Sequence, residues 1–400
     1  MESAKRSRRT ALHFVVMIGV LSFFADFTYE GSRSIIGPYL GSLGASALVV
    51  ATVTGFGELL GYLLRLGSGR LADRTGLYWP VTIFGYVIQM ASVPALALTG
   101  SWPAAAALII LERIGKAIRN PPRDAMLSHA GKQLGGYGWA FGLHEALDQF
   151  GAMFGPLLVA AMLAWRGDYH SAFAVLLVPA IVNIGLVLVA RWSYPRPQDM
   201  EASVPDGQTK GLSKIYWVYL GGAVLVAAGF ADYPLIAFHF AQARSFSSET
   251  VAIFYAVAMA VSGCGSLALG RLFDRFGFAV LIGLTLVSAL YAPLVFFGGF
   301  WTALVGAAIW GLGMGVHESI IPAAVAPMVP VQRRASAFGL FTAGYGIFWF
   351  LGSVAIGALY GMSIAGVVAF CVIAQLFAVP IFIWVGRRYP SSPARGPSDR

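Results

Sequence analysis

Long apolar segments follow one another along almost the whole chain and are separated mostly by short polar connections. Each segment reaches the length of about 20 residues that a helix needs to cross a lipid bilayer. We therefore predict an all-α membrane protein with twelve transmembrane helices, near residues 12–40, 47–69, 79–99, 102–122, 137–165, 169–191, 214–241, 249–270, 277–298, 301–325, 334–360 and 363–387.

One long polar linker, at residues 193–213, interrupts this pattern between the sixth and seventh predicted helices. It predicts an N-terminal six-helix bundle over 1–192 and a C-terminal six-helix bundle over 214–400 that ends in a short tail. Because the remaining connections are short, we expect no separate soluble domain.

The two halves share a charged turn. Gly-Arg-Leu-Ala-Asp-Arg-Thr-Gly at 69–76 returns 201 residues later as Gly-Arg-Leu-Phe-Asp-Arg-Phe-Gly at 270–277, with six of eight positions identical. Two tetrapeptides also recur in the same order, 24–27 as 230–233 and 140–143 as 337–340, at offsets of 206 and 197. Pseudo-symmetric halves are typical of secondary transporters, which form a site where the repeats meet.

Composition and charge change this interpretation little. The chain is 58% hydrophobic and 11% charged, with a mean hydropathy of +0.73. A net charge of +9 would suit a nucleic-acid partner, but 23 of the 27 Lys and Arg residues lie in the tails, after even-numbered helices or on the inner half of the fourth span. This bias predicts cytoplasmic termini in a bacterial inner membrane, and we expect no nucleic-acid binding.

Other chemistry is sparse in the sequence. Cys264 and Cys371 lie within predicted spans, and the histidines are scattered, so the pattern favours neither a disulfide nor a metal site. The sequence also lacks the Gly-x-x-x-x-Gly-Lys-Ser/Thr loop that binds nucleotide phosphates. We expect no cofactor, no metal and no enzymatic activity, and an ion or substrate gradient as the source of energy.

The charged turn resembles the signature of the major facilitator superfamily, Gly-x-x-x-Asp-Arg/Lys-x-Gly followed by two bases. Leu77 and Tyr78 stand where the bases are expected, so their charges are missing or are supplied by the basic stretch 113–124. The resemblance implies two pseudo-symmetric six-helix bundles and a conformational latch on the cytoplasmic face. The latch candidates are Gly69, Asp73, Arg74 and Gly76, with Gly270, Asp274, Arg275 and Gly277 in the second copy.

A second resemblance lies in the fifth predicted helix. Gly151, Gly155 and Pro156 are similar to the Gly-x-x-x-Gly-Pro core of proton-driven antiporters in the superfamily, although Val159-Ala160 replaces a later glycine pair. Small residues four apart allow close helix packing, and proline bends the helix. The resemblance favours export over uptake, and ordinary helix packing is the alternative.

Ionisable residues within the predicted spans are the main functional signal, because a charge at the bilayer centre costs about 2.5–3.5 kcal/mol on insertion scales. A carboxyl group in a cavity of low dielectric constant is closer to neutrality than one in water, so it can take up and release protons. The alternative is structural pairing, of Glu112 with Arg113 or Lys116 and of Glu30 with Arg33. The proton-coupling candidates are Asp26, Glu30, Glu58, Glu112, Glu145, Asp148 and Asp232.

The resemblance places the first, fourth, seventh and tenth helices around a central cavity and implies an arginine near a proton site, a role that Arg113 matches in part. The rings of Tyr29, Trp310, Tyr345 and Trp349 suit either a flat ligand or ordinary packing. Acids and bases are both present, so charge does not identify the substrate. The substrate-cavity candidates are Tyr29, Arg113, His144, His239, His317, Glu318 and Tyr345.

We interpret the chain as a secondary transporter that moves a small organic solute by alternating access and functions as a monomer in the lipid bilayer. Proton-coupled export is the favoured activity, and proton-coupled import of a metabolite is the alternative. A lipid-translocating protein or an intramembrane enzyme is the alternative from a different class. An enzyme needs a nucleophile and a base in one cavity, and the sequence shows no such arrangement.

Overall fold

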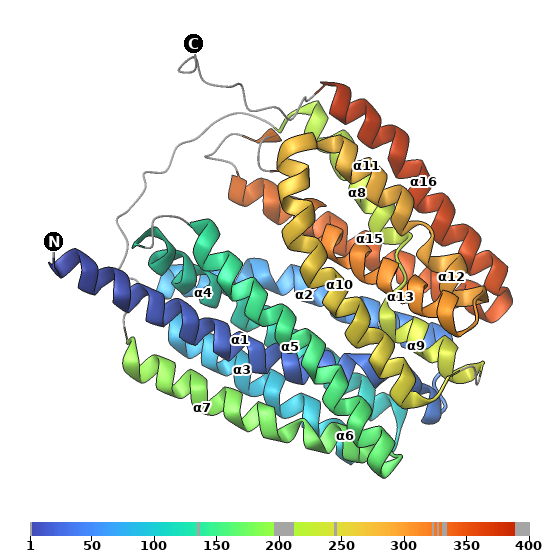
Figure 1. The fold of residues 1–400 in the computed structure, drawn as a ribbon, viewed down its shortest axis with the longest axis horizontal. Helices are drawn as coiled ribbons and strands as arrows, with labels where there is room; N and C mark the ends of the chain where they lie inside the picture. The colour runs from blue at the N-terminus through green and yellow to red at the C-terminus, as the bar shows by residue number, and fades with distance from the viewer. Residues whose placement is uncertain are drawn as a thin grey trace. The chain divides into compact units, whose positions relative to one another are not determined.

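The computed structural model describes residues 2–133, 137–195, 212–243, 246–321, 324–325, 328–329 and 334–388 (Figure 1). Every regular element in these ranges is a helix. The long helices are α1 (Glu2–Ser42), α2 (Ala47–Thr75), α3 (Tyr78–Ala95), α4 (Trp102–Gln133), α5 (Tyr137–Arg166), α10 (Ser248–Phe276), α15 (Arg334–Met362) and α16 (Ile364–Arg388). The shorter helices are η1 (Leu96–Leu98), α6 (Tyr169–Val175), α7 (Leu177–Ser193), α8 (Lys214–Ala228), α9 (Tyr233–Gln242), α11 (Phe278–Ser288), α12 (Tyr291–Phe297), α13 (Phe300–Gly315) and the π-helical η3 (Val316–Ile320).

The predicted all-α membrane fold is confirmed. The described residues contain 11 helical segments that are long and apolar enough to cross a membrane. The predicted span at 102–122 is not among them, because its helix, α4, carries Glu112, Arg113, Lys116 and Arg119 within two turns. These four charges are the reason that α4 matters for the site described below.

Several predicted spans are interrupted. The span predicted at 214–241 forms α8 and α9 with the non-helical residues 229–232 between them, and the span at 301–325 turns π-helical at Val316. The span at 169–191 is divided into α6 and α7. Before α6, Asp168 accepts a hydrogen bond from the Ser171 N–H at 2.7 Å, and this bond holds the pKa of the Asp168 carboxyl below its usual range.

The repeated turn ends a helix in the same way in both copies. Gly76 follows α2 with φ +68°, and its N–H bonds the Ala72 carbonyl at 2.8 Å. Gly277 follows α10 with φ +57°, and its N–H bonds the Phe273 carbonyl at 2.7 Å. Both glycines adopt a positive φ that other residues rarely tolerate, which gives the last glycine of the repeat a backbone role.

The chain forms two compact units, Met1–Pro205 with Asp232–Ala260, and Asp206–Ala231 with Val261–Arg400. The segment Asp232–Ala260, which contains α9 and the first half of α10, therefore belongs to the first unit. The predicted bundle boundary at the 193–213 linker stays a prediction, and residues 196–211 lie outside the described ranges.

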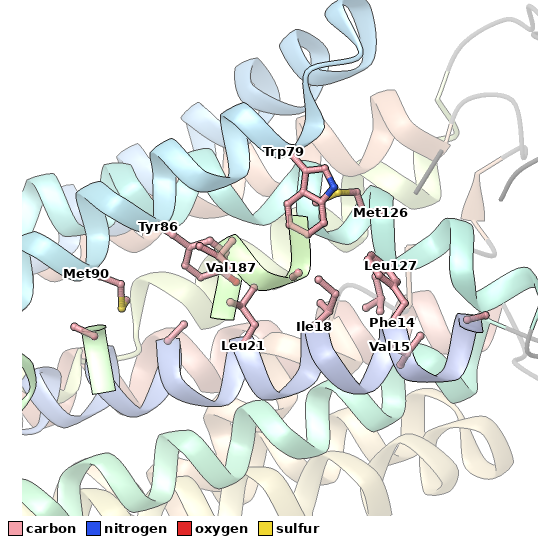
Figure 2. Packing of buried hydrophobic residues seen from close by; sticks show 14 residues of the cluster. Phe14, Val15, Ile18, Leu21, Trp79, Tyr86, Met90, Met126, Leu127 and Val187 are labelled. Carbon is pink, nitrogen blue, oxygen red and sulfur yellow. The ribbon is translucent and has the colours of Figure 1, made fainter. Parts of the chain in front are cut away.

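An apolar core of the first unit lies along one face of α1 (Figure 2). Phe14, Ile18 and Leu21 repeat every three or four residues, so their side chains share this face. They pack with Trp79 and Tyr86 of α3, together with side chains of α4 and α7. Polar and charged residues occupy another face of α1 and form the site described below.

Candidate functional site

A polar stripe on α1 brings together charged side chains of the first unit. Ser22, Asp26, Glu30 and Arg33 are spaced three or four residues apart, with Tyr29 beside Glu30, so they lie along one side of the helix. Their partners come from α2, α3, α4 and α5 and from the Asp232–Ala260 segment. We call these α1 residues, together with the side chains that they contact directly or through one another, the α1 charge network.

Arg33 lies at one end of the α1 charge network and is shared by three acids. Its Nη2 atom donates to Asp232 Oδ1 at 2.7 Å and to Glu58 Oε1 at 3.3 Å. Its Nη1 atom is 4.0 Å from Glu30 Oε2. The side chains of Arg33 and Asp232 are only 5% and 1% exposed, so Arg33 compensates a carboxylate that would otherwise be buried alone.

Asp232 is held by few groups. It directly precedes α9, but its side chain makes no capping hydrogen bond. One carboxylate oxygen, Oδ1, accepts from Arg33, whereas the buried Oδ2 has no hydrogen-bond partner among the described residues. A proton on Oδ2 therefore disrupts no hydrogen bond to that oxygen, and it weakens the pairing with Arg33.

Glu58 connects Arg33 to the charges of α4. Its Oε1 atom accepts from Arg33 and is 2.8 Å from Nη1 of Arg113. Arg113 Nε lies 3.7 Å from Glu112 Oε2, and the other oxygen of Glu112 accepts from Gln89 Nε2 at 2.8 Å. Glu58 and Arg113 form the closest pair in this part of the network.

Tyr29 lies between three cations. Its ring centroid is 3.8 Å from Lys116 Nζ, 4.8 Å from Arg113 Cζ and 5.9 Å from Arg33 Cζ. The side chain is buried, and its hydroxyl has no hydrogen-bond partner among the described residues. The electron-rich face of the ring attracts these cations and separates them from one another.

Asp26 is paired with two bases of α4. Its Oδ1 atom lies 3.3 Å from Arg119 Nη2 and 3.7 Å from Lys116 Nζ. Arg119 is fully buried and also donates to Gln89 Oε1 at 2.5 Å and to the Tyr86 hydroxyl at 3.1 Å. Structural pairing was the alternative for such acids, and the contacts of Asp26 fit it; its role as a proton carrier stays a prediction.

A second polar chain starts from Ser22. The Ser22 hydroxyl accepts from Arg123 Nη1 at 2.9 Å and lies 2.7 Å from His144 Nε2. The other ring nitrogen of His144 is 3.6 Å from Asp148 Oδ2. Ligand atoms of His144, Glu145 and Asp148 lie within 4.8 Å of one another, which suits a cation, but the guanidinium of Arg123 bonded to Ser22 opposes one.

The remaining cavity candidates are divided between the units. His239 lies on α9 in the first unit, with its ring 6.1 Å from that of Phe240. His317, Glu318 and Tyr345 lie in the second unit, where Tyr345 and His317 Nδ1 are hydrogen-bonded and Glu318 is exposed. The α1 charge network therefore includes neither His317 nor Tyr345.

The latch contacts stay a prediction. The side chains of Asp73 and Asp274, and residue Gly270, lie outside the part of the chain whose side chains the structure describes. Arg74 is exposed at the end of α2, and Arg275 lies over the Phe276 ring at 5.1 Å. In the basic stretch 113–124, which is one of the two alternatives for the missing latch charges, Arg119 contacts Asp26 and Arg123 contacts Ser22.

Close packing of α5 on α1 explains the spacing of Gly151 and Gly155. A Cβ atom at Gly151 would lie 2.2 Å from the Phe23 carbonyl oxygen, and one at Gly155 would lie 2.1 Å from that of Phe27. Any larger residue would separate the two backbones. Pro156 lies within α5 directly after this contact.

Sequence reasoning missed Ser22, Gln89 and Tyr255. The Gln89 side chain accepts a hydrogen bond from Arg119 and donates one to Glu112, so it connects the Asp26 and Glu58 parts of the network. The Tyr255 hydroxyl, on α10, donates to Glu30 Oε2. A buried glutamine in the otherwise apolar third span was an available signal, whereas a serine or tyrosine in a span is too common to indicate a site.

The α1 charge network is suited to proton-dependent rearrangement. It places five acids against four cations, and Arg33, Glu58 and Asp26 each have more than one partner. The acids are Asp26, Glu30, Glu58, Glu112 and Asp232, and the cations are Arg33, Arg113, Lys116 and Arg119. Protonation of Asp232 leaves Arg33 with Glu58 and Glu30 in reach. The contacts of Ser22 with His144, and of His144 with Asp148, place a hydroxyl beside an imidazole and a carboxylate, and Arg123 donates to the same hydroxyl.

Comparisons with known proteins agree with this fold. The family model described as Major Facilitator Superfamily matches residues 18–316 and 219–400. The uncharacterised protein Rv2265 of Mycobacterium tuberculosis is 40% identical over 383 residues, which cover 94% of this chain and 93% of the relative. The multidrug resistance protein MdtH of Edwardsiella ictaluri is 27% identical over 173 residues, 42% of this chain and 41% of the relative. The crystal structure of the nucleoside transporter NupG superposes with a TM-score of 0.74 at 14% identity, over 94% of this chain and 99% of NupG.

Proposed function

We propose that this chain, which belongs to the Major Facilitator Superfamily, is a secondary transporter. It couples proton movement to the export of a small organic compound. The observation that carries the proposal is the sharing of one buried guanidinium, Arg33, by Asp232, Glu58 and Glu30. Such a cation has an alternative partner when one acid is protonated.

Asp232 is the acid best suited to bind the coupled proton. Its Oδ2 atom is buried and lacks a hydrogen-bond partner among the described residues, so protonation there disturbs only the ion pair with Arg33. Glu58, at 3.3 Å, and Glu30, at 4.0 Å, then compensate the guanidinium. Because the charge is never left alone, the penalty of about 3–5 kcal/mol for breaking a buried pair is avoided in part.

The ion pair has a mechanical consequence, since it joins α1 to the start of α9. The two helices also pack closely, because a Cβ atom at Gly37 would overlap the Pro234 carbonyl oxygen at 1.7 Å. The Tyr255 hydroxyl holds α10 to Glu30 of α1. Protonation of Asp232 removes one of these polar attachments and so favours separation of the Asp232–Ala260 segment from α1.

Two observations support export over uptake. The glycines of α5 that resemble the antiporter core make backbone contacts with α1, the helix that carries the network. A relative that matches 42% of this chain is named a multidrug resistance protein. Uptake of a metabolite by the same machinery is the alternative, and the orientation of the gradient distinguishes the two.

Transport into inverted membrane vesicles with an imposed pH gradient, acid inside, tests the proposal. A panel of radiolabelled metabolites and drugs should reveal at least one compound that wild-type protein accumulates and that vesicles without the protein do not. Asp232→Asn should abolish gradient-driven accumulation and retain exchange of labelled for unlabelled compound across the membrane. Glu249→Gln changes another acid of the Asp232–Ala260 segment and should leave accumulation unchanged.

Gradient-driven accumulation by Asp232→Asn at the wild-type level would remove Asp232 from the coupling step. Accumulation that responds only to the opposite gradient orientation would favour uptake. If no gradient drives accumulation of any compound that the protein exchanges, proton coupling itself is wrong.

A further inference from the structure

The interruption of the seventh predicted span is stabilised by aromatic side chains of the second unit. Between α8 and α9, the Ala231 N–H donates to the Tyr291 hydroxyl at 2.6 Å, and this hydroxyl donates to the Gly229 carbonyl at 3.2 Å. Trp310 Nε1 donates to the Ala231 carbonyl at 2.8 Å. Non-helical backbone at membrane depth requires such partners, and broken helices are where transporters place their sites.

Phe230 projects from this interruption into a set of four aromatic rings. Its ring centroid is 4.3 Å from that of His317, 5.0 Å from Tyr291, 5.6 Å from Trp310 and 5.7 Å from Trp349. The Trp310 ring is stacked at 24°, and Phe230 is fully buried. We call these four surrounding rings the aromatic cage, and one planar ring fills it.

Glycine at position 313 leaves room for that ring. A Cβ atom at Gly313 would lie 2.7 Å from the Phe230 ring and 2.8 Å from Ser288 Oγ. The backbone of α13 therefore forms one wall of the cage. The size of the cage is set by the residues around it and not by Phe230 alone.

Two polar atoms of the cage lack partners. His317 Nε2 and Trp349 Nε1 are buried and have no hydrogen-bond partner among the described residues, although His317 Nδ1 is bonded to the Tyr345 hydroxyl. The two side chains are 6% and 3% exposed, and their rings are 5.4 Å apart. A buried polar atom without a hydrogen-bond partner is unfavourable, so two such atoms on neighbouring rings indicate a partner that is present in another state.

We infer that the aromatic cage binds a planar ring of the transported compound in the place that Phe230 now occupies. The inference rests on the proposed function as a small-molecule transporter. Trp310 stacks on the flat part of the ligand, the other three rings contact it at tilted angles, and an acceptor at its edge receives the Trp349 Nε1–H. His317 Nε2 serves a second acceptor or a donor, according to its tautomer.

The chemical class follows from the atoms that line the cage. The side chains whose rings contact Phe230 among the described residues, Tyr291, Trp310, His317 and Trp349, carry no carboxylate, ammonium or guanidinium group. The ligand is therefore an uncharged aromatic or heteroaromatic compound with a carbonyl or ring nitrogen at its edge. Phe230 lies on non-helical backbone and His317 in a π-helical turn, so both can move without loss of a regular α-helix.

Acridone, an uncharged planar compound with one carbonyl, is a suitable probe. Its fluorescence anisotropy reports binding to the purified full-length protein in detergent, without a pH gradient. Trp349→Phe keeps an aromatic ring and removes the donor, so it should weaken binding about tenfold. Phe230→Ala should tighten binding by at least about tenfold, because the competing ring is gone.

Matched controls separate the cage from general apolar binding. Trp301→Phe changes a tryptophan of α13 that is 74% exposed and should leave acridone binding unchanged. Dicyclohexyl ketone has the same number of carbons and a carbonyl but no planar ring, and it should not displace acridone. If Phe230→Ala does not yield folded protein, Phe230→Leu makes the same test, because its side chain cannot stack.

The inference is overturned if Trp349→Phe binds acridone as Trp301→Phe does, if the folded Phe230 variants bind it more weakly than wild type, or if dicyclohexyl ketone displaces it. Lack of binding by both wild type and Phe230→Ala also overturns it. Because the assay uses no gradient, acridone binding to the cage with no pH-driven transport would overturn proton coupling and leave the cage intact. Proton-driven transport of compounds whose affinity does not depend on Trp349 would overturn the inference about the cage and leave proton coupling intact.

Discussion

Removal of the Arg33 charge should destabilise the protein mainly through Asp232. In the Arg33→Gln variant, Glu58 still has its ion pair with Arg113 at 2.8 Å, and Glu30 still accepts a hydrogen bond from the Tyr255 hydroxyl. Asp232 loses the cation at 2.7 Å while its side chain stays 1% exposed. Breaking a buried pair in this way costs about 3–5 kcal/mol, so we expect a loss of stability in that range.

A second substitution at Asp232 should restore much of that loss. In the double variant Arg33→Gln/Asp232→Asn, no unpaired carboxylate stays buried at this position, and an amide can hydrogen-bond to another amide. The coupling between the two positions should therefore be about 2–3 kcal/mol, within the range measured for residues in direct contact. In contrast, Arg33→Gln combined with Glu249→Gln should show additive losses.

Unfolding of the purified protein in detergent, followed by intrinsic fluorescence over a denaturant series, measures these differences. The double variant should unfold at a higher denaturant concentration than Arg33→Gln. If the losses of Arg33→Gln and Asp232→Asn are additive, the two side chains do not stabilise each other. The ion pair then carries neither stability nor the proposed coupling.

Three further predictions concern topology, the latch and the other acid of the repeat. Cysteines at Ser203 and Ser392 should resist an impermeant thiol reagent added to intact cells, because the linker and the C-terminus are expected in the cytoplasm; labelling from outside would reverse the topology. Asp73→Asn should reduce transport more than it reduces folding yield, and Asp274→Asn should have the smaller effect; wild-type transport by folded Asp73→Asn protein would remove the latch. Asp26→Asn should lower thermal stability if Asp26 is a member of a structural cluster, and should abolish pH-driven accumulation while substrate binding persists if it carries the coupled proton.

The fold was predictable because each helix has a local signal. Eleven of the twelve predicted spans have the length and hydropathy of a membrane helix, and the final glycines of the repeated turn, Gly76 and Gly277, end α2 and α10 in the structure. The interruption at 229–232 was not predictable in the same way. Its backbone is held by Tyr291 and Trp310, which lie 60 or more residues further along the chain.

The site was predictable in composition but not in its pairings. The acids of the α1 charge network were all recognised as costly in a span, whereas Arg119 was assigned only to the basic stretch 113–124. Sequence spacing suggested pairing of Glu30 with Arg33, which at 4.0 Å is the longest contact that Arg33 makes with an acid. Its shortest contact is with Asp232, 199 residues away. The repeat aligns Asp26 with Asp232, but Asp26 lies within α1 and contacts bases of α4, whereas Asp232 lies between α8 and α9 and contacts Arg33. Helix packing, and not the repeat, determines which base lies near each acid.

The order of Phe230 and Asp232 along the chain links ligand binding to protonation. Both lie in the non-helical residues 229–232, so a backbone rotation that moves Phe230 out of the aromatic cage also moves Asp232 relative to Arg33. Ionised Asp232 resists that rotation because it would leave a buried ion pair, whereas protonated Asp232 does not. Ligand and proton should therefore favour each other, and thermodynamic linkage makes the effect reciprocal.

Asp232→Asn, which resembles the protonated acid, should bind acridone more tightly than wild type, with Glu249→Gln unchanged. Equal affinities in Asp232→Asn and wild type, measured on folded protein at the same pH, would show that the cage and the ion pair act independently.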